Sequence, residues 1–189
     1  WAGRELVQKV ELPTIDSFIV GSMGVSFSAV LLEHQPGARV TYGCLEHLVR
    51  EIPRLREEFG VDPGRVESTH AHSGDPGDDD WGSESYDLVF LTRKMILEPS
   101  ENIGEKFARK AFDVLSPKGV AVFWETVYTE SEPMPLGRAM EAVFDLCTSP
   151  SAPARSAGDY QRLFHEIGYA SVEVVPCLGG QTTFLIARK

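Results

Sequence analysis

The carboxylate with the strongest claim to chemistry is Glu125, which directly follows an apolar run at residues 120–124. A short apolar run of this kind is typical of a buried strand in a parallel sheet. Ligands of open parallel sheets bind outside the carboxyl ends of the strands, so a side chain directly after a central strand would point into the binding crevice. Glu125 is therefore the candidate catalytic residue.

A second candidate site is the turn after the apolar run at residues 17–21. It contains Gly21 and Gly24, and a glycine-bearing turn after a first strand lets the backbone approach a nucleotide-like ligand closely. The turn does not carry the three-glycine fingerprint of NAD-binding proteins. Cys44, which follows the second predicted strand, cannot hold a ribose as an acid would. An NAD-dependent dehydrogenase is therefore the weakest interpretation.

Two further groups have both a chemical and a plain structural interpretation. His70 and His72 lie on one face of an extended segment, and with Asp75 or the aspartates at 78–80 they could bind a metal. We favour a strand edge that leads into a solvated loop, because no third ligand is fixed by spacing. Cys44 near a helix start is either a reactive thiol with a lowered pKa or, as we favour, a buried side chain.

Short apolar runs alternate with longer periodic segments along the chain, which predicts a βαβ arrangement. The capping box formed by Ser156 and Asp159 predicts the start of the last helix, which runs to Ile167. The last two strands, separated by Gly179 and Gly180, would form an antiparallel hairpin at one sheet edge. The predicted strands are 17–21, 38–42, 65–69, 86–91, 120–124, 171–175 and 182–187, and the other predicted helices are 25–34, 45–59, 103–115 and 136–146, with a loop at 70–85.

Length and composition limit the class of protein. The 189 residues, 42% of them hydrophobic, predict a single domain over 1–189, in which 1–16 form a lead-in helix or linker. The net charge of −10 opposes contact with nucleic acid or an anionic membrane. Three cysteines without paired spacing favour a reducing, cytoplasmic setting. From the start at Trp1, without a Met, we hypothesise a fragment of a longer chain, and an oligomer is the other arrangement considered.

Short motifs stand among these elements: Gly3-Arg4, Leu31-Leu32 with Pro36-Gly37, Lys110-Ala111-Phe112, Pro117-Lys118-Gly119, Asp159-Tyr160 and the ending Leu185-Ile186-Ala187-Arg188-Lys189. In this order, the elements and motifs resemble the catalytic domain of class I S-adenosylmethionine-dependent O-methyltransferases of the acetylserotonin and caffeic acid type. The resemblance covers nearly the whole chain and implies a Rossmann-like methyltransferase fold: a mostly parallel seven-stranded sheet with a C-terminal antiparallel hairpin and helices on both faces. Members of the family usually carry a winged-helix dimerisation domain before this one.

The glycine turn implied by the resemblance is partly replaced. Gly21 and Gly24 stay in the turn after the first strand. Ser22 and Met23 replace the family's next two glycines. Ile19 stands where the family has an acid that could face the methionyl ammonium, so the resemblance implies that this contact is lost.

The resemblance places the remaining cofactor contacts on four residues. The family's ribose-binding acid falls on Cys44, and Glu46, two residues on, is the substitute considered. The family's adenine-binding Asp falls on His72, while Arg93 matches the family's Arg after the fourth strand. Losing several such hydrogen bonds, at roughly 1.5–3 kcal/mol each, would weaken cofactor binding by several orders of magnitude.

The catalytic positions implied by the resemblance are also incomplete. Counting from Arg93, the family's general base, a His, falls on Ile96, and an isoleucine cannot accept a proton from a phenol. The first of the two carboxylates that orient the base is kept as Glu125. The second falls on Ala154. One of three catalytic groups therefore remains.

Three functions stay open on this reasoning. The leading hypothesis is a non-catalytic pseudo-methyltransferase that serves binding or assembly with an unidentified small molecule or protein, either without a cofactor or with S-adenosylmethionine. The alternative is an active O-methyltransferase for a small hydroxylated aromatic, using Glu125 and Glu46. The third is the same fold recruited to another ligand and other chemistry.

Overall fold

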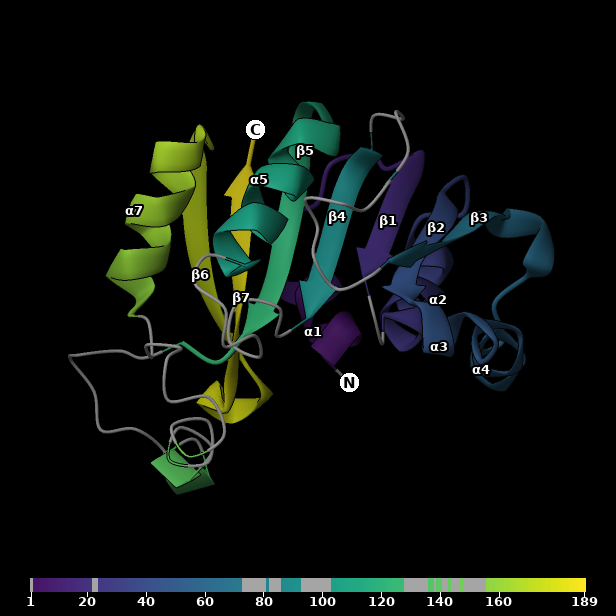
Figure 1. Cartoon of the computed structure of the whole chain (residues 1–189), viewed down its shortest axis with the longest axis horizontal. Helices are drawn as coiled ribbons and strands as arrows, with labels where there is room; N and C mark the ends of the chain where they lie inside the picture. Colours follow the sequence, from purple (N-terminus) through teal and green to yellow (C-terminus); the bar gives the residue numbers. More distant parts are fainter. Residues whose placement is uncertain are drawn as a thin grey trace.

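Seven strands form one sheet in the order β3-β2-β1-β4-β5-β7-β6 (Figure 1). The computed structural model describes residues 2–21, 24–72, 81, 86–92, 103–127, 136–137, 139–140, 143, 147 and 156–189. Strands β1 to β5 are parallel, and β7 runs antiparallel to both β5 and β6. The predicted mixed sheet with a C-terminal hairpin is therefore confirmed. The strands are β1 Ser17–Gly21, β2 Arg39–Leu45, β3 Val66–His72, β4 Tyr86–Thr92, β5 Leu115–Glu125, β6 Ser171–Cys177 and β7 Thr182–Arg188.

Helices cover both faces of this sheet (Figure 1). They are α1 Ala2–Lys9, α2 Val25–His34, α3 Glu46–Val49, α4 Ile52–Phe59, α5 Ile103–Val114 and α7 Ala157–Ile167, with short 3₁₀ helices η1 Pro63–Arg65 and η2 Leu178–Gly180. One buried apolar cluster joins the sheet to α1, α2 and α4, and a second joins it to α5 and α7. We call these sides of the sheet the α2 face and the α5 face.

Alternation along the strands decides which side chain enters which cluster. Successive strand residues point to opposite faces, so neighbours in sequence separate into the two cores. Phe18 and Val20 belong to the α2 face, whereas Ile19 between them belongs to the α5 face. Both faces of the central strands are buried, which explains why these strands read as continuous apolar runs.

The predicted helix at 45–59 is wrong as a single element, because the structure has α3 and α4 there. Pro53 lies in the first turn of α4. A proline lacks the amide hydrogen that a helix interior requires, and it disfavours helical backbone in the residue before it. The chain therefore ends one helix before the proline and begins another with the proline in its first turn.

The predicted loop at 70–85 begins too early. β3 continues through His70 to His72, whose backbones lie opposite Gly43 and Leu45 of β2. The extension arises because β2 offers a strand partner, which the polar composition of the segment does not reveal. Residues 73–80 and 82–85 lie outside the described residues.

β5 also begins earlier than predicted, at Leu115 instead of residue 120. Leu115 pairs with Tyr86, and the register then shifts before Leu88 meets Val120. Residues 116–119, which lie between the predicted helix and the predicted strand, are therefore an irregularity within β5, where Lys118 has a φ of 69°.

The last helix begins as predicted. The Ser156 hydroxyl accepts the Asp159 amide at 3.2 Å, and the Asp159 carboxylate accepts the Ser156 amide at 2.8 Å. This reciprocal capping box satisfies two amide groups that the first turn of a helix leaves without partners. The predicted helix at 136–146 lies partly outside the described residues, and 136, 137, 139, 140 and 143 within it are helical.

Candidate functional site

The predicted site residues gather at one edge of the sheet. The parallel strands β1, β2, β3 and β5 end there at Gly21, Leu45, His72 and Glu125. The strand order reverses between β1 and β4, and ligands of such sheets bind at that switch point, outside the carboxyl ends. We call this region the carboxyl-edge crevice. Arg93, Ile96 and Ala154, which the sequence also places in the site, lie outside the described residues.

Packing disfavours a side chain at Gly21 and Gly24. A Cβ at Gly21 would lie 2.7 Å from Cδ2 of Leu91, and one at Gly24 would lie 2.7 Å from Cβ of Val20. Real Cβ atoms essentially never come so close to another carbon. The Gly24 amide also donates to the Gly21 carbonyl at 3.2 Å and closes the turn. These two glycines are thus explained without a ligand.

Ile19 is a core residue. Its side chain is 2% exposed and belongs to the apolar cluster on the α5 face, which also holds Val89 and Leu91. An unpaired carboxylate in such surroundings would be costly to ionise. The packing around position 19 therefore favours an apolar side chain over the acid that the resemblance leads one to expect.

Cys44 is a buried thiol, as favoured from the sequence. It is 2% exposed and belongs to the cluster on the α2 face. Burial raises the pKa of the Cys44 thiol, the opposite of what a reactive cysteine needs. Glu46, the substitute ribose ligand, is exposed at the first residue of α3. The backbone of His72 pairs with Leu45 at the end of β3.

Glu125 is completely buried at the end of β5. Its partner across the antiparallel ladder is Thr183 of β7, which is 3% exposed. Glu125 lies two residues after Phe123, so the two share the α5 face. Cys44 belongs to the α2 face, so the structure does not bring Cys44 and Glu125 together.

The burial of the cysteines predicts their reactivity. Of the three thiols, Cys147 is exposed, whereas Cys44 and Cys177 are buried. Burial also raises the pKa of Cys177. In the native protein at pH 8, we expect one thiol to react rapidly with a disulfide reagent such as 5,5′-dithiobis(2-nitrobenzoate), and all three to react in denaturant.

The variant Cys147→Ser should remove the rapid phase in that titration. A thiol that still reacts rapidly in native Cys147→Ser would contradict the buried positions of Cys44 and Cys177.

A groove of about 1100 Å³ lies away from the carboxyl-edge crevice. It runs over the outer side of α2, between α1 and the end of α4, and sequence reasoning missed it. Apolar side chains, including Val30 and the 43% exposed Phe59, line it together with charged ones, including Glu5. Its walls come from three separate segments, at residues 4–5, 26–33 and 59–65, which explains why no local pattern indicates the groove.

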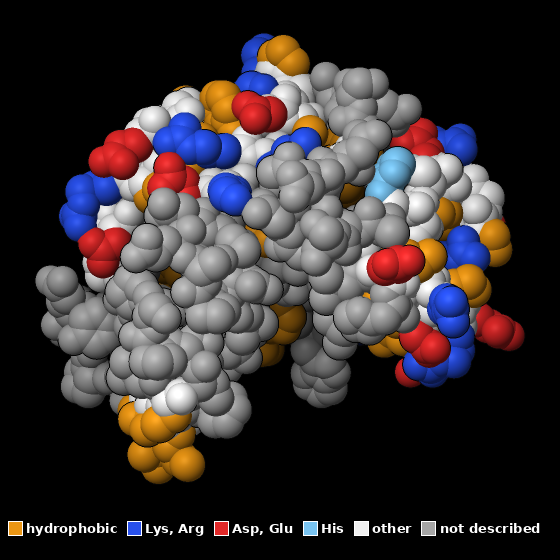
Figure 2. Space-filling model, viewed as in Figure 1, with side chains coloured by type: hydrophobic (Ala, Val, Ile, Leu, Met, Phe, Trp, Pro, Cys, Tyr) orange, Lys and Arg blue, Asp and Glu red, His pale blue; other side chains and the backbone are white. Residues whose placement is uncertain are grey.

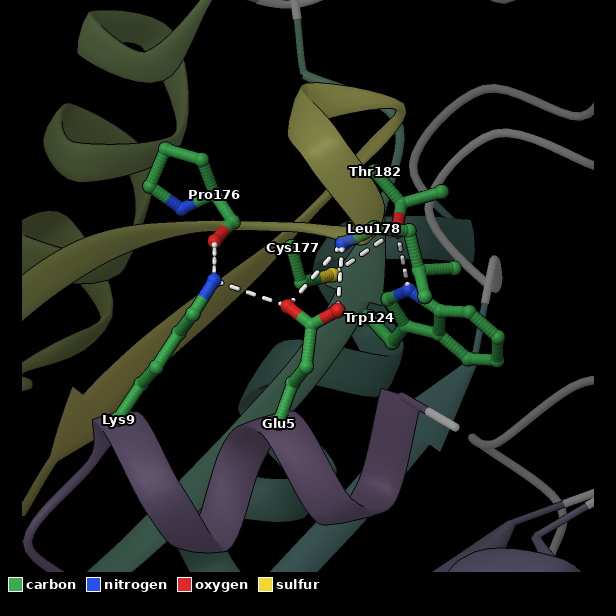
Figure 3. Close-up of polar contacts among 7 residues, drawn as sticks. All are labelled: Glu5, Lys9, Trp124, Pro176, Cys177, Leu178 and Thr182. Carbon is green, nitrogen blue, oxygen red and sulfur yellow. Dashed lines mark hydrogen bonds and ion pairs between the residues drawn. The ribbon is translucent and has the colours of Figure 1, made fainter.

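Sequence reasoning also missed polar contacts beside Glu125. The indole nitrogen of Trp124 donates to the Thr182 hydroxyl at 2.8 Å, and the Cys177 sulfur lies 2.9 Å from the same oxygen (Figure 3). Helix α1 reaches the same hairpin through Glu5 and Lys9. The one sequence signal is the spacing of Glu5 and Lys9, four residues apart on one helix face.

The described residues contain no group of three His, Cys, Asp or Glu side chains arranged to hold a metal ion. None of the helices in the described part of the chain has the length and apolar character needed to cross a membrane.

Solved structures with this fold include O-methyltransferases. A putative O-methyltransferase from Nostoc punctiforme PCC 73102 matches 99% of this chain with a TM-score of 0.82 and 19% identity. The mitomycin 7-O-methyltransferase MmcR matches 100% with a TM-score of 0.80 and 14% identity. Human N-acetylserotonin methyltransferase, solved in complex with SAM, matches 99% with a TM-score of 0.74 and 14% identity.

The chain spans about half the length of these structures: 54%, 53% and 51% of their chains, respectively. No protein-family model matches the sequence, and no curated protein matches it. At these identities the likeness establishes the fold, which is the one that the sequence resemblance implied.

Proposed function

We propose that this chain is a methyltransferase-fold domain that does not transfer methyl groups and instead serves binding or assembly. The observation that carries the proposal is the packing of two cofactor positions into the apolar cores. Ile19 and Cys44 are each 2% exposed, and they belong to clusters on opposite faces of the sheet. Neither side chain can accept a hydrogen bond from an ammonium or ribose hydroxyl as a carboxylate does.

The chemistry of the cofactor explains why these losses matter. S-adenosylmethionine carries an ammonium, a sulfonium and a ribose diol, all of which carboxylates bind well. The described part of the crevice offers two acids, the exposed Glu46 and the buried Glu125. These residues fit the cofactor poorly, because Glu46 stands two residues beyond the ribose position and Glu125 two strands away from β1. We therefore assign no reaction step to the cofactor.

An exposed apolar stripe supports a role in assembly. Leu136, Met140 and Val143 are 77%, 65% and 61% exposed. Their i, i+4, i+7 spacing places them on one side of a helix. Apolar side chains gather at the lower tip of the molecule in Figure 2, where this segment lies in Figure 1. Exposed apolar patches of this kind mark contact surfaces, so a protein partner or further domain is proposed to cover the stripe.

The alternative function is an active O-methyltransferase for a small hydroxylated aromatic. Two observations favour it: Glu125 lies at the carboxyl end of β5, and Glu46 begins the helix that follows β2. In that case Glu46 would bind the ribose and Glu125 would orient the acceptor hydroxyl.

Calorimetric titration with S-adenosylmethionine and S-adenosylhomocysteine separates the two functions. We expect no saturable binding up to about 1 mM, which corresponds to less than about 4 kcal/mol of binding free energy. A transfer assay with labelled cofactor and a panel of phenols should then give no product above the protein-free rate.

Micromolar binding together with methyl transfer would overturn the proposal. The alternative further expects Glu46→Gln to weaken cofactor binding by about tenfold or more, a loss of about 1.4 kcal/mol. Glu33→Gln, which removes an exposed carboxylate from α2 instead, is the matched control and should leave binding unchanged.

A further inference from the structure

Helix α1 holds the turn between β6 and β7 through two side chains (Figure 3). Both carboxylate oxygens of Glu5 accept the Leu178 amide, at 3.2 Å each. The Lys9 ammonium donates to the Pro176 carbonyl at 3.0 Å and to Glu5 at 2.8 Å. Lys9 thus binds the carbonyl of the residue before Cys177, and Glu5 binds the amide of the residue after it.

The held turn has an unusual backbone. Leu178, Gly179 and Gly180 have φ angles of 51°, 66° and 83°, all in the left-handed region. This region disfavours any residue with a Cβ, so Leu178 adopts it only because its surroundings hold it there. The Leu178 amide is the group that Glu5 binds, so the carboxylate stabilises the turn at its least favourable residue.

The turn lies at the same edge of the sheet as the carboxyl end of β5. Because β7 runs antiparallel to β5, the start of β7 lies beside the end of β5, where Thr183 pairs with Glu125 and Phe184 with Trp124. The hydrogen bond from Trp124 to Thr182 and the contact of Thr182 with Cys177 connect β5 to the turn. A shift of the turn therefore reaches the strand end that carries Glu125.

The residue directly after the turn lies beside the segment that exposes the apolar stripe. A Cβ at Gly137 would lie 2.9 Å from the side-chain oxygen of Gln181, the residue directly after the turn. Gly137 follows Leu136, the first member of the stripe. The turn thus contacts α1 and the end of β5, and the residue after it lies beside the segment that begins the stripe.

The Glu5 carboxylate is suited to hold this turn. The hydrogen bond from Lys9, and next the one from the Leu178 amide, lower the pKa of Glu5, so the group is ionised at neutral pH. Its side chain is 28% exposed, and it also lines the groove over α2. Contacts made to α1 in the groove can therefore reach Glu5 from solvent.

We infer that Glu5 is a positioning residue: through the Leu178 amide, α1 fixes the turn between β6 and β7 and, through Thr182 and Trp124, the end of β5 that carries Glu125. The inference rests on the proposed binding role only in treating the crevice as a site. Its geometry is independent of whether S-adenosylmethionine binds.

Nuclear magnetic resonance of the ¹⁵N-labelled 189-residue chain, without ligand, tests the inference. We expect Glu5→Ala to raise the exchange rate of the Leu178 amide by about tenfold or more, because a charge-assisted hydrogen bond is lost. The indole N–H resonance of Trp124 should shift at the same time. Glu5→Gln, which keeps an acceptor oxygen, should restore part of the protection.

Two controls keep a general loss of stability apart from a loss of positioning. Glu33→Ala removes a second carboxylate that lines the groove and should leave both resonances unchanged. Amides in β1 and β4 should exchange in Glu5→Ala as in the wild type. An unchanged Leu178 exchange rate, or a Trp124 indole that does not respond to Glu5→Ala, would overturn the inference. Because no ligand is added, these outcomes do not depend on the calorimetric result.

Discussion

Replacement of Phe90 by alanine is expected to lower the free energy of unfolding by about 3–5 kcal/mol, since a fully buried aromatic ring leaves a cavity. Phe90 is 2% exposed on β4, and its ring stacks on Phe27 of α2 with centroids 3.6 Å apart and planes at 6°. This contact packs α2, the helix that follows the glycine turn, against the centre of the sheet. A domain stable by about 5–15 kcal/mol would lose a large share of its stability.

Urea unfolding followed by circular dichroism measures this loss, with Phe59→Ala as the control. Phe59 is 43% exposed at the end of α4, so its truncation should cost less than about 1 kcal/mol. Phe27→Ala and the double variant complete a cycle, whose coupling energy should be about 0.5–1.5 kcal/mol for a stacked pair. Equal midpoints for Phe90→Ala and Phe59→Ala would show that α2 is not held by this ring.

The strands were predictable because both faces of the sheet are buried. The run at 17–21 is apolar from Phe18 onward, and residues of opposite parity enter different cores, so an apolar run bounded by polar residues marks β1 without any knowledge of its neighbours. The end of β3 was not predictable in this way. Residues 70–72 are polar in part, and they form a strand only because residues 43–45 of β2 lie alongside and pair with them.

The place of the candidate site was predictable, but its internal geometry was not. Strand order alone brings Gly21, Cys44 and Glu125 to one sheet edge. The face of the sheet on which a side chain lies depends on strand register. Cys44 and Glu125 lie on opposite faces and therefore do not meet. The contact of Glu5 with Leu178 joins residues 173 apart in sequence, and no local pattern encodes such a pairing.

The second large effect concerns Gly21, for which the sequence and the structure give different reasons. If the glycine exists to admit a ligand, alanine there should fold with wild-type stability. The structure instead places a new Cβ 2.7 Å from Cδ2 of Leu91, which is 1% exposed and surrounded by the core on the α5 face. Overpacking of this kind costs about 1–3 kcal/mol, so we expect Gly21→Ala to lower the free energy of unfolding by that amount.

A double-mutant cycle with Leu91 identifies the cause. Leu91→Ala alone should cost about 2–5 kcal/mol through its cavity, and the double variant should cost less than the sum of the two single variants, because the new methyl group enters the space that the leucine leaves. Gly43→Ala is the matched control: Gly43 lies opposite Gly21 on β2, and its Cβ would sit at an ordinary 3.5 Å from Ile19. The packing explanation would be contradicted if the losses in free energy of unfolding were additive, or if Gly21→Ala were as stable as Gly43→Ala. Either result would favour a ligand-binding reason for the glycine and weaken the case for a non-catalytic domain.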